Sequence, residues 1–153
     1  MTEHPLGNRA VAQIAIVVRD LEKAVEVYSR LLGMEKPNIR ISDEYDQART
    51  QYHGQPSPAR VKMAFFDLGS VQLELMQPVG EPSAWKDVLD SRGEGLHHIA
   101  FQVPDTDAAL QYLDAQGMPM IQQGQYTGGQ YTYVDSEPQL GIMLELLENF
   151  NAK

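Results

Sequence analysis

The pattern of hydrophobic and polar positions predicts eight short β-strands and two longer helices. The helices, at residues 21–32 and 105–116, repeat apolar residues every three or four positions, as expected for helices packed on a sheet. Asp20 and Asp105 stand at the N-cap positions, and a glycine follows each helix. The predicted strands lie near residues 11–18, 35–41, 60–67, 70–77, 96–103, 118–123, 130–135 and 141–147.

The same order of elements occurs twice along the chain. Residues 13–20 resemble residues 98–105, and residues 71–76 resemble residues 142–147. Each half reads as one strand, one helix and three strands, which indicates duplication of a βαβββ unit. We therefore predict a single α+β domain over residues 1–153. Its parts are module one at about 10–78, a linker at about 79–94 that contains a short helix, and module two at about 95–148.

In the first and last predicted strand of each module, side chains alternate between two faces. One face is apolar, and the other carries one side chain that could coordinate a metal. Gln13 matches His98 in the repeat, and Glu74 matches Glu145. Two ionised glutamates among apolar neighbours are costly to bury unless a cation compensates them. These four residues therefore predict a shared site for one divalent metal ion. By the same alternation, His97 is expected to face the helix layer instead.

The segments around Gln13 and His98, with the Leu-Glu-Leu runs at 73–75 and 144–146, resemble the vicinal oxygen chelate superfamily. That group contains glyoxalase I, methylmalonyl-CoA epimerase, extradiol dioxygenases and antibiotic-resistance proteins. The resemblance covers roughly residues 11–148 and is closest to methylmalonyl-CoA epimerase-like proteins. It implies two tandem βαβββ modules that form a cupped eight-stranded mixed sheet, with metal ligands at the four positions selected above.

Two positions depart from the epimerase pattern. The epimerases resemble one another in having His where this chain has Gln13, and a catalytic Glu where it has Lys62. A Gln, Glu, His, Glu ligand set resembles that of eukaryotic glyoxalase I instead. Glu145 is the first candidate for a catalytic base, in a role shared with coordination. Lys62 is the second, because family parity places it toward the cup, although a solvated lysine or an anion clamp explains it equally well.

The ligand set limits the metal and the reaction. Three oxygen donors and one imidazole suit Zn, Co, Ni, Mn, Fe or Mg without distinguishing among them. Such an ion, with two positions left for substrate, stabilises charge formed beside a carbonyl. We expect an isomerase or epimerase acting next to a carbonyl, for example of an acyl-CoA such as methylmalonyl-CoA. A glyoxalase I-like lyase and a non-catalytic binding protein of the antibiotic-resistance type are the alternatives.

The composition of the chain limits the kinds of molecule that it is expected to bind. The chain carries a net charge of −9 with an isoelectric point of about 4.8, which disfavours nucleic acid. Its apolar runs are too short to span a membrane, and it has no cysteine, which excludes thiolate ligands and disulfides. We expect a cytoplasmic protein with a small-molecule substrate, and a homodimer, which is common among the relatives.

Two further segments have open interpretations. Residues 42–59 are polar and long for a loop in a compact domain, which is typical of a functional or mobile segment. Tyr126, Tyr131 and Tyr133 flank a Gly-Gly turn. They indicate either a rim loop over a substrate or a hairpin with cross-strand tyrosines, which is the commoner case.

Overall fold

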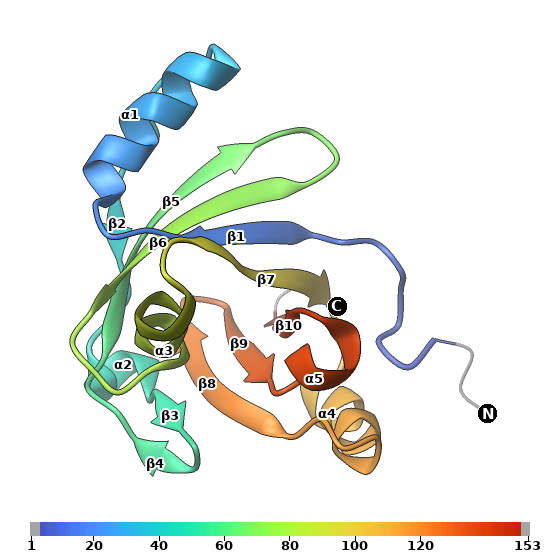
Figure 1. Cartoon of the computed structure of the whole chain (residues 1–153). Helices are drawn as coiled ribbons and strands as arrows, with labels where there is room; N and C mark the ends of the chain where they lie inside the picture. Colours follow the sequence, from blue (N-terminus) through green and yellow to red (C-terminus); the bar gives the residue numbers. More distant parts are fainter. Residues whose placement is uncertain (1–3, 151–153) are drawn as a thin grey trace.

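The computed structural model describes residues 4–150 and contains one curled, mixed sheet with five helices around it (Figure 1). The sheet order is β2-β5-β6-β1-β7-β10-β9-β8-β3-β4. The strands are β1 (Gln13–Val17), β2 (Arg40–Ile41), β3 (Gln51–Tyr52), β4 (Gln55–Pro56), β5 (Arg60–Asp67), β6 (Gln72–Val79), β7 (Gly95–Gln102), β8 (Met120–Tyr126), β9 (Gly129–Val134) and β10 (Met143–Asn149). The helices are α1 (Leu21–Leu32), α2 (Tyr45–Ala48), α3 (Ala84–Arg92), α4 (Thr106–Ala115) and α5 (Glu137–Leu140).

The strands β2-β5-β6-β1 and β8-β9-β10-β7 form two halves of this sheet with a similar order. In each half the first strand pairs in parallel with the last, as β1 does with β6 and β7 with β10. The halves meet where β1 pairs antiparallel with β7. The four strands that were predicted to carry the ligands are therefore neighbours, in the order β6-β1-β7-β10 at the middle of the sheet.

The sheet has ten strands, two more than the eight predicted. The extra pair, β3 and β4, is a short hairpin inside the polar segment 42–59. It crosses to module two, where Gln51 pairs with Gln123 and Tyr52 with Gln122 on β8. The backbone N–H of His53 also donates to the carbonyl oxygen of Ile121 at 2.8 Å. This segment is thus an ordered connection between the modules rather than a free loop.

Helices α1 and α4 cover the outer face of the sheet. Beneath α1 lie Leu73 and Leu75, and beneath α4 lie Leu144 and Leu146, all buried. Both N-caps were predicted correctly, since the Asp20 and Asp105 side chains accept hydrogen bonds from backbone N–H groups in the first turn of α1 and of α4. No helix within residues 4–150 has the length and apolar character needed to cross a bilayer.

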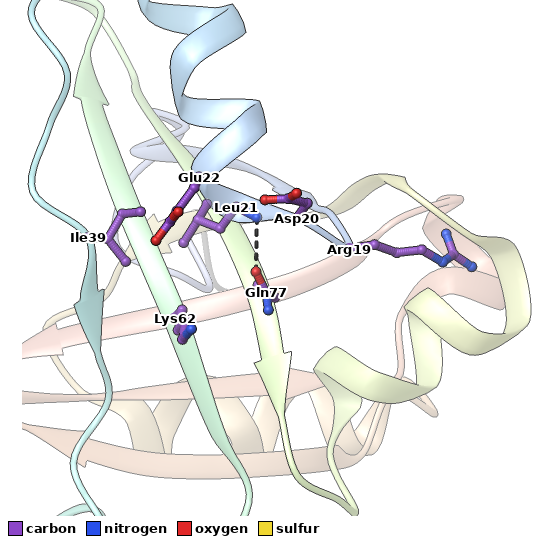
Figure 2. A pocket seen from close by; sticks show the side chains of 7 residues that line it. All are labelled: Arg19, Asp20, Leu21, Glu22, Ile39, Lys62 and Gln77. Atoms are coloured by element: carbon purple, nitrogen blue, oxygen red, sulfur yellow. Dashed lines mark hydrogen bonds between the residues drawn. The ribbon is translucent and has the colours of Figure 1, made fainter.

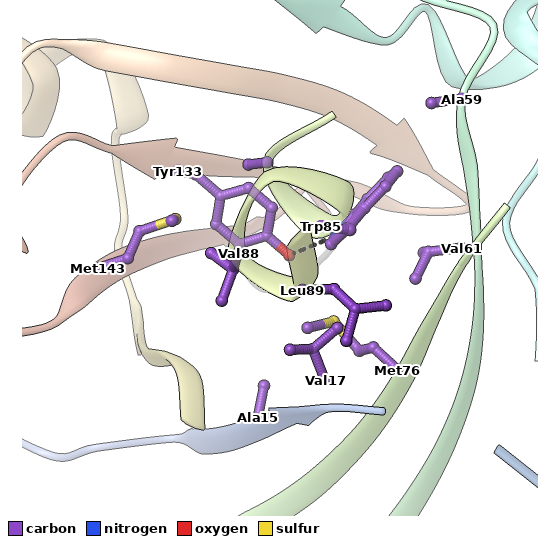
Figure 3. Close-up of a cluster of buried hydrophobic side chains, with 11 residues drawn as sticks. Ala15, Val17, Ala59, Val61, Met76, Trp85, Val88, Leu89, Tyr133 and Met143 are labelled. Atoms are coloured by element: carbon purple, nitrogen blue, oxygen red, sulfur yellow. Dashed lines mark hydrogen bonds between the residues drawn. The ribbon is translucent and has the colours of Figure 1, made fainter. Parts of the chain in front are cut away.

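Helix α3, the linker helix, lies against the inner face of the sheet (Figure 3). Its side chains Trp85, Val88 and Leu89 pack into one cluster with residues of both modules. The buried sheet residues of this cluster are Ala15, Val17, Val61, Met76, Tyr133 and Met143. The linker thus closes part of the cup and contacts the same face on which the four coordinating side chains lie.

Candidate metal centre

The four predicted ligands converge on the inner face, and each comes from one of the four central strands. Gln13 lies on β1, Glu74 on β6, His98 on β7 and Glu145 on β10. Their exposures are 5%, 5%, 0% and 4%, so all four side chains are shielded from bulk water. Alternation along β1, β6 and β10 places Gln13, Glu74 and Glu145 on this face, because the residues on either side of each one point outward.

The distances between the four side chains fit a bound cation. His98 Nε2 lies 3.2 Å from Glu145 Oε1 and 3.6 Å from Glu74 Oε1. One end of the Gln13 amide lies 2.8 Å from His98 Nε2, 3.2 Å from Glu74 Oε1 and 3.0 Å from Glu145 Oε1. Donors bonded to one ion at about 2.1 Å stand about 3.0 Å apart at right angles and about 3.4 Å apart at the tetrahedral angle. The observed separations bracket both values.

The amide of Gln13 completes this set. No group of three or more His, Asp or Glu side chains within residues 4–150 is arranged to hold a metal by itself. The Gln13 amide can present either end to the cluster, since its oxygen and its NH₂ group have nearly the same shape. The NH₂ end would donate to both carboxylates, whereas the oxygen end would be a fourth ligand. Its other end lies 2.8 Å from Gln72 Oε1.

The pKa values of both carboxyl groups are raised. Burial raises the pKa of Glu145 to about 8, against a smaller lowering by a hydrogen bond from Tyr133. Burial, and then the charge of Glu145, raises the pKa of Glu74 well above its ordinary value. Two carboxyls so placed retain protons at neutral pH unless a positive charge replaces them, which is what a divalent ion supplies.

The two histidines are neutral. Burial lowers the pKa of His98 to about 3, and burial together with the neighbouring His98 lowers the pKa of His97 to about 3. A neutral imidazole keeps a lone pair on one ring nitrogen, as metal ligation requires. The cluster therefore offers one imidazole nitrogen, one amide and two carboxylates, a set whose charge of −2 balances a divalent ion.

His97 does not face the outer helix layer, so that expectation was wrong. The register between β1 and β7 shifts at this point, because Ala15 is opposite His98 while Ile16 is opposite Leu96. The bulge adds one residue to β7, which turns His97 toward the inner face. There His97 is fully buried, with its ring against Tyr133 and α3. Simple alternation had no means of detecting the bulge.

Lys62 lies apart from the cluster, contrary to the orientation expected from family parity. It is opposite Gln77 on β6 and shares its face of β5 with Ala64, which packs under α1. Figure 2 shows Lys62 lining a pocket on the outer face, beside the first turn of α1. No contact in the described residues connects it to the four ligands, and its catalytic role remains a prediction.

Three tyrosines of the β8–β9 hairpin line the inner face beside the cluster. The hairpin interpretation of the Gly-Gly turn is confirmed, since β8 and β9 pair from Met120 to Tyr126. The pKa values of Tyr126, Tyr131 and Tyr133 are all raised, first by burial and in part by the charge of Glu145. All three phenols are therefore protonated at neutral pH. The sequence indicated the hairpin but not the position of these tyrosines beside the cluster.

Comparison with known proteins identifies the superfamily of the chain. A family model described as the glyoxalase/bleomycin resistance protein/dioxygenase superfamily matches residues 12–134. The chain belongs to this superfamily. A 2-epi-5-epi-valiolone epimerase from Actinomyces is 31% identical over 149 residues, covering 92% of this chain and 80% of the relative. An ethylmalonyl-CoA/methylmalonyl-CoA epimerase from Cereibacter sphaeroides is 33% identical over 113 residues, covering 73% of this chain and 74% of the relative.

A solved structure extends the similarity to the whole fold. The methylmalonyl-CoA epimerase of Mycobacterium tuberculosis superposes with a TM-score of 0.68 at 26% identity, covering 97% of this chain and 93% of that one. These three relatives are epimerases, which supports an enzyme of the vicinal oxygen chelate superfamily with isomerase chemistry. The predicted superfamily and its cupped, mixed sheet are confirmed.

Proposed function

We propose that this protein is a divalent-metal-dependent epimerase that removes a proton from a carbon next to a carbonyl group. The observation that carries the proposal is the convergence of Gln13, Glu74, His98 and Glu145, with donor separations of 2.8–3.6 Å. The epimerase relatives support the reaction class. The metal and the ligand set are our inference from the donor geometry and its charge.

Glu145 is our candidate for the base. A divalent ion bound here would supply a Lewis acid that stabilises negative charge on the substrate oxygen. Glu145 lies on β10 opposite Tyr133 of β9, and a hydrogen bond from Tyr133 lowers its pKa against the larger effect of burial. Epimerisation also needs a proton returned to the opposite face of the carbon. Glu74 reaches the cluster from β6, on the other side of the β1–β7 pair, and is our candidate for passing on a proton that it first takes from solvent, because as an ionised ligand it holds none of its own.

The first test is metal content and proton exchange. Purified protein should contain close to one divalent ion per chain, and the Glu74→Ala/Glu145→Ala double variant should contain none. Methylmalonyl-CoA and 2-epi-5-epi-valiolone, taken from the names of the relatives, are the first probes. Solvent deuterium should enter the carbon beside the carbonyl only in metal-loaded protein. A probe that binds without any exchange would count against the proposal.

A glyoxalase I-like lyase is the second candidate, favoured by Gln13 and by the full Gln, Glu, His, Glu set. Its test is turnover of methylglyoxal with glutathione by the same metal-loaded protein. Activity there, with no exchange in the two epimerase probes, would transfer the proposal to the lyase. A binding protein without chemistry would instead bind small molecules without metal and show neither activity.

We also propose a homodimer and retain the cytoplasmic location as a prediction. Val27 and Leu31 project from the outer side of α1 with exposures of 47% and 75%, and Ile41 on the edge strand β2 is 42% exposed. Such side chains favour burial against a second copy. Light scattering after gel filtration should give twice the mass of one chain. The Leu31→Lys variant should shift this mass toward the monomer, and Glu22→Lys on the same helix should not.

A further inference from the structure

Ala84, the first residue of α3, contacts His97 next to His98, and its backbone is fixed from two sides. The N–H of Ala84 donates to Gln122 Oε1 at 2.7 Å. The carbonyl oxygen of Ala84 faces His97 Nε2 at 3.0 Å. Ala84, His97 and Gln122 are each at most 2% exposed, so water does not compete for these bonds. The Ala84 peptide group therefore has a fixed position and presents its carbonyl oxygen to His97.

The Ala84 carbonyl determines which nitrogen of His97 carries the hydrogen. A carbonyl oxygen only accepts, so the facing Nε2 of His97 must be the N–H donor. A neutral imidazole has one N–H, which leaves His97 Nδ1 as an acceptor. His98 Nδ1 lies 2.8 Å from it and must therefore donate. The single N–H of His98 is then on Nδ1, and its Nε2 keeps a lone pair.

That lone pair points into the four-residue cluster. His98 Nε2 is the atom 2.8 Å from the Gln13 amide and 3.2 Å from Glu145 Oε1. The NH₂ end of Gln13, when turned inward, lies within hydrogen-bond distance of this nitrogen and of both carboxyl groups, and its two hydrogens can serve two of these three acceptors. This tautomer therefore gives the Gln13 amide an acceptor at His98 Nε2. The opposite tautomer would place two lone pairs against each other, at His97 Nε2 and the Ala84 oxygen. The depressed pKa values of both histidines agree with neutral rings.

We propose that His97 is a positioning residue, which uses the Ala84 carbonyl of the linker helix to hold His98 in the tautomer that ligates metal through Nε2. His97 itself touches neither the metal nor the substrate. The proposal rests on the metal site proposed above. It also gives the linker a role, because α3 then orders a ligand of module two from outside that module.

The direct test is the tautomer of His98 in metal-free protein, observed by ¹⁵N NMR of the imidazole rings. Wild-type protein should show His98 protonated on Nδ1 alone. The His97→Phe variant removes the acceptor, and His98 should then populate both tautomers. The His97→Gln variant should preserve the wild-type tautomer, since its amide oxygen accepts from His98 and its NH₂ group donates to Ala84. His53→Gln, at the tip of the β3–β4 hairpin, serves to assign spectra and should change nothing at His98.

The second readout is affinity for Zn²⁺ and Co²⁺, measured by competition with a chelator. Loss of a partner that orients a ligating histidine typically lowers metal affinity by about 10–100-fold, and we expect this for His97→Phe. His97→Gln should stay within about threefold of wild type. Val88→Ala removes buried methyl groups from the same helix and leaves the Ala84–His97–His98 hydrogen bonds in place. It measures how much a loosened α3 lowers affinity by itself, and we expect no more than about twofold.

Each outcome decides the proposal. Wild-type His98 protonated on Nε2 would overturn it, and so would a folded His97→Phe variant that keeps both the tautomer and the affinity. If His97→Phe does not fold, the wild-type spectrum and the His97→Gln variant are sufficient, and loss of the tautomer in His97→Gln would also overturn it. A wild-type protein that binds no metal would refute the proposed function. The spectrum of metal-free protein would still test whether His97 sets the tautomer of His98.

Discussion

Glu145 differs from Glu74 in having a phenol as a hydrogen-bond partner. The indole N–H of Trp85 donates to the Tyr133 hydroxyl at 2.9 Å (Figure 3). Because an indole only donates, the hydroxyl oxygen accepts this bond, and its own hydrogen is free to go to Glu145. That second bond lowers the pKa of Glu145 against the stronger effect of burial. Of the two carboxyls, Glu145 is thus the one whose ionised form a hydrogen bond stabilises.

The Glu145→Gln variant should abolish most proton exchange. Glutamine keeps the shape and an oxygen ligand but cannot accept the proton, so the exchange rate should fall by about 10²–10⁴-fold. Deuterium uptake by a bound probe at saturating metal measures this loss. Lys62→Gln is the matched control, since Lys62 lies on the outer face. A loss in the Lys62 variant as large as in the Glu145 variant would restore Lys62 as the base.

The Tyr133→Phe variant should move the pH profile of exchange to higher pH. Without the phenol hydrogen bond, the pKa of Glu145 rises further, so its basic form appears later on a pH titration. The stability cost should be about 1–3 kcal/mol, because Trp85 Nε1 is left buried and unpaired. Tyr131→Phe is the control, since the Tyr131 hydroxyl accepts from Gln122 and the Glu145 bond is with Tyr133. Equal pH shifts in both variants would contradict this role for Tyr133.

At the level of residues, the repeat was the effective signal in the sequence. It selected Gln13, Glu74, His98 and Glu145, and the structure brings these four side chains together. Alternation failed at His97 because one inserted residue in β7 reverses the face, and a bulge depends on the pairing with β1. Lys62 was assigned by analogy with a family position, which carries no information about which face of β5 this chain turns inward.

The β8–β9 hairpin shows how an element can be shaped around one side chain. Gly124 is opposite Tyr131, and a Cβ atom added at Gly124 would lie 2.7 Å from the Tyr131 ring and hydroxyl. The missing side chain lets the tyrosine lie across the neighbouring strand, where its hydroxyl accepts a hydrogen bond from Gln122. The glycine is thus needed for space.

The Gly124→Ala variant should therefore displace Tyr131 and destabilise the protein. We expect a loss of about 1–3 kcal/mol in the free energy of unfolding, which is typical of overpacking, measured by urea titration. The Gly124→Ala/Tyr131→Leu double variant should recover much of this loss relative to Tyr131→Leu alone, because the clash is gone. If the loss is the same with or without the tyrosine ring, the cause lies in the backbone and our explanation fails.

The long elements were predictable and the short ones were not. Helix α1 has the predicted bounds, and the long strands shift by only a few residues, because periodicity is clear over that length. Strands β3 and β4 have two residues each, too few to show any period. They exist because β8, some 70 residues later in the chain, offers an edge to pair with. Only the fold of the whole chain creates that edge.

At the level of the whole molecule, the site belongs to neither module alone. Gln13 and Glu74 come from module one, whereas His98 and Glu145 come from module two. The two halves are joined by the β1–β7 pairing, the β3–β8 pairing and the packing of α3. Anything bound at the cluster therefore links the halves, and its binding free energy adds to the stability of the complete fold.

Without a cation, the same cluster makes folding stability depend on pH. Glu145 and Glu74 have raised pKa values, so from about pH 4.5 upward the folded state holds protons that the unfolded state has released. Raising the pH to about 8 thus lowers stability. The two histidines act in the opposite sense, because stability rises between about pH 3 and 6.5 as the unfolded state releases its protons. Above pH 6.5 the histidines no longer change the stability, and of these four groups only the two glutamates still affect it.

Metal-free protein should therefore lose stability between pH 6.5 and pH 8, by at most about 1.4 kcal/mol per pH unit for each carboxyl. Bound Zn²⁺ should remove or reverse this slope, because it requires both carboxylates ionised. Urea unfolding at several pH values, with EDTA or with Zn²⁺, measures both slopes. The Glu74→Gln/Glu145→Gln variant should show neither the metal-free decline nor the response to Zn²⁺. If stability still declines with pH in this variant, groups outside the cluster cause the decline, and our explanation of the pH dependence is wrong.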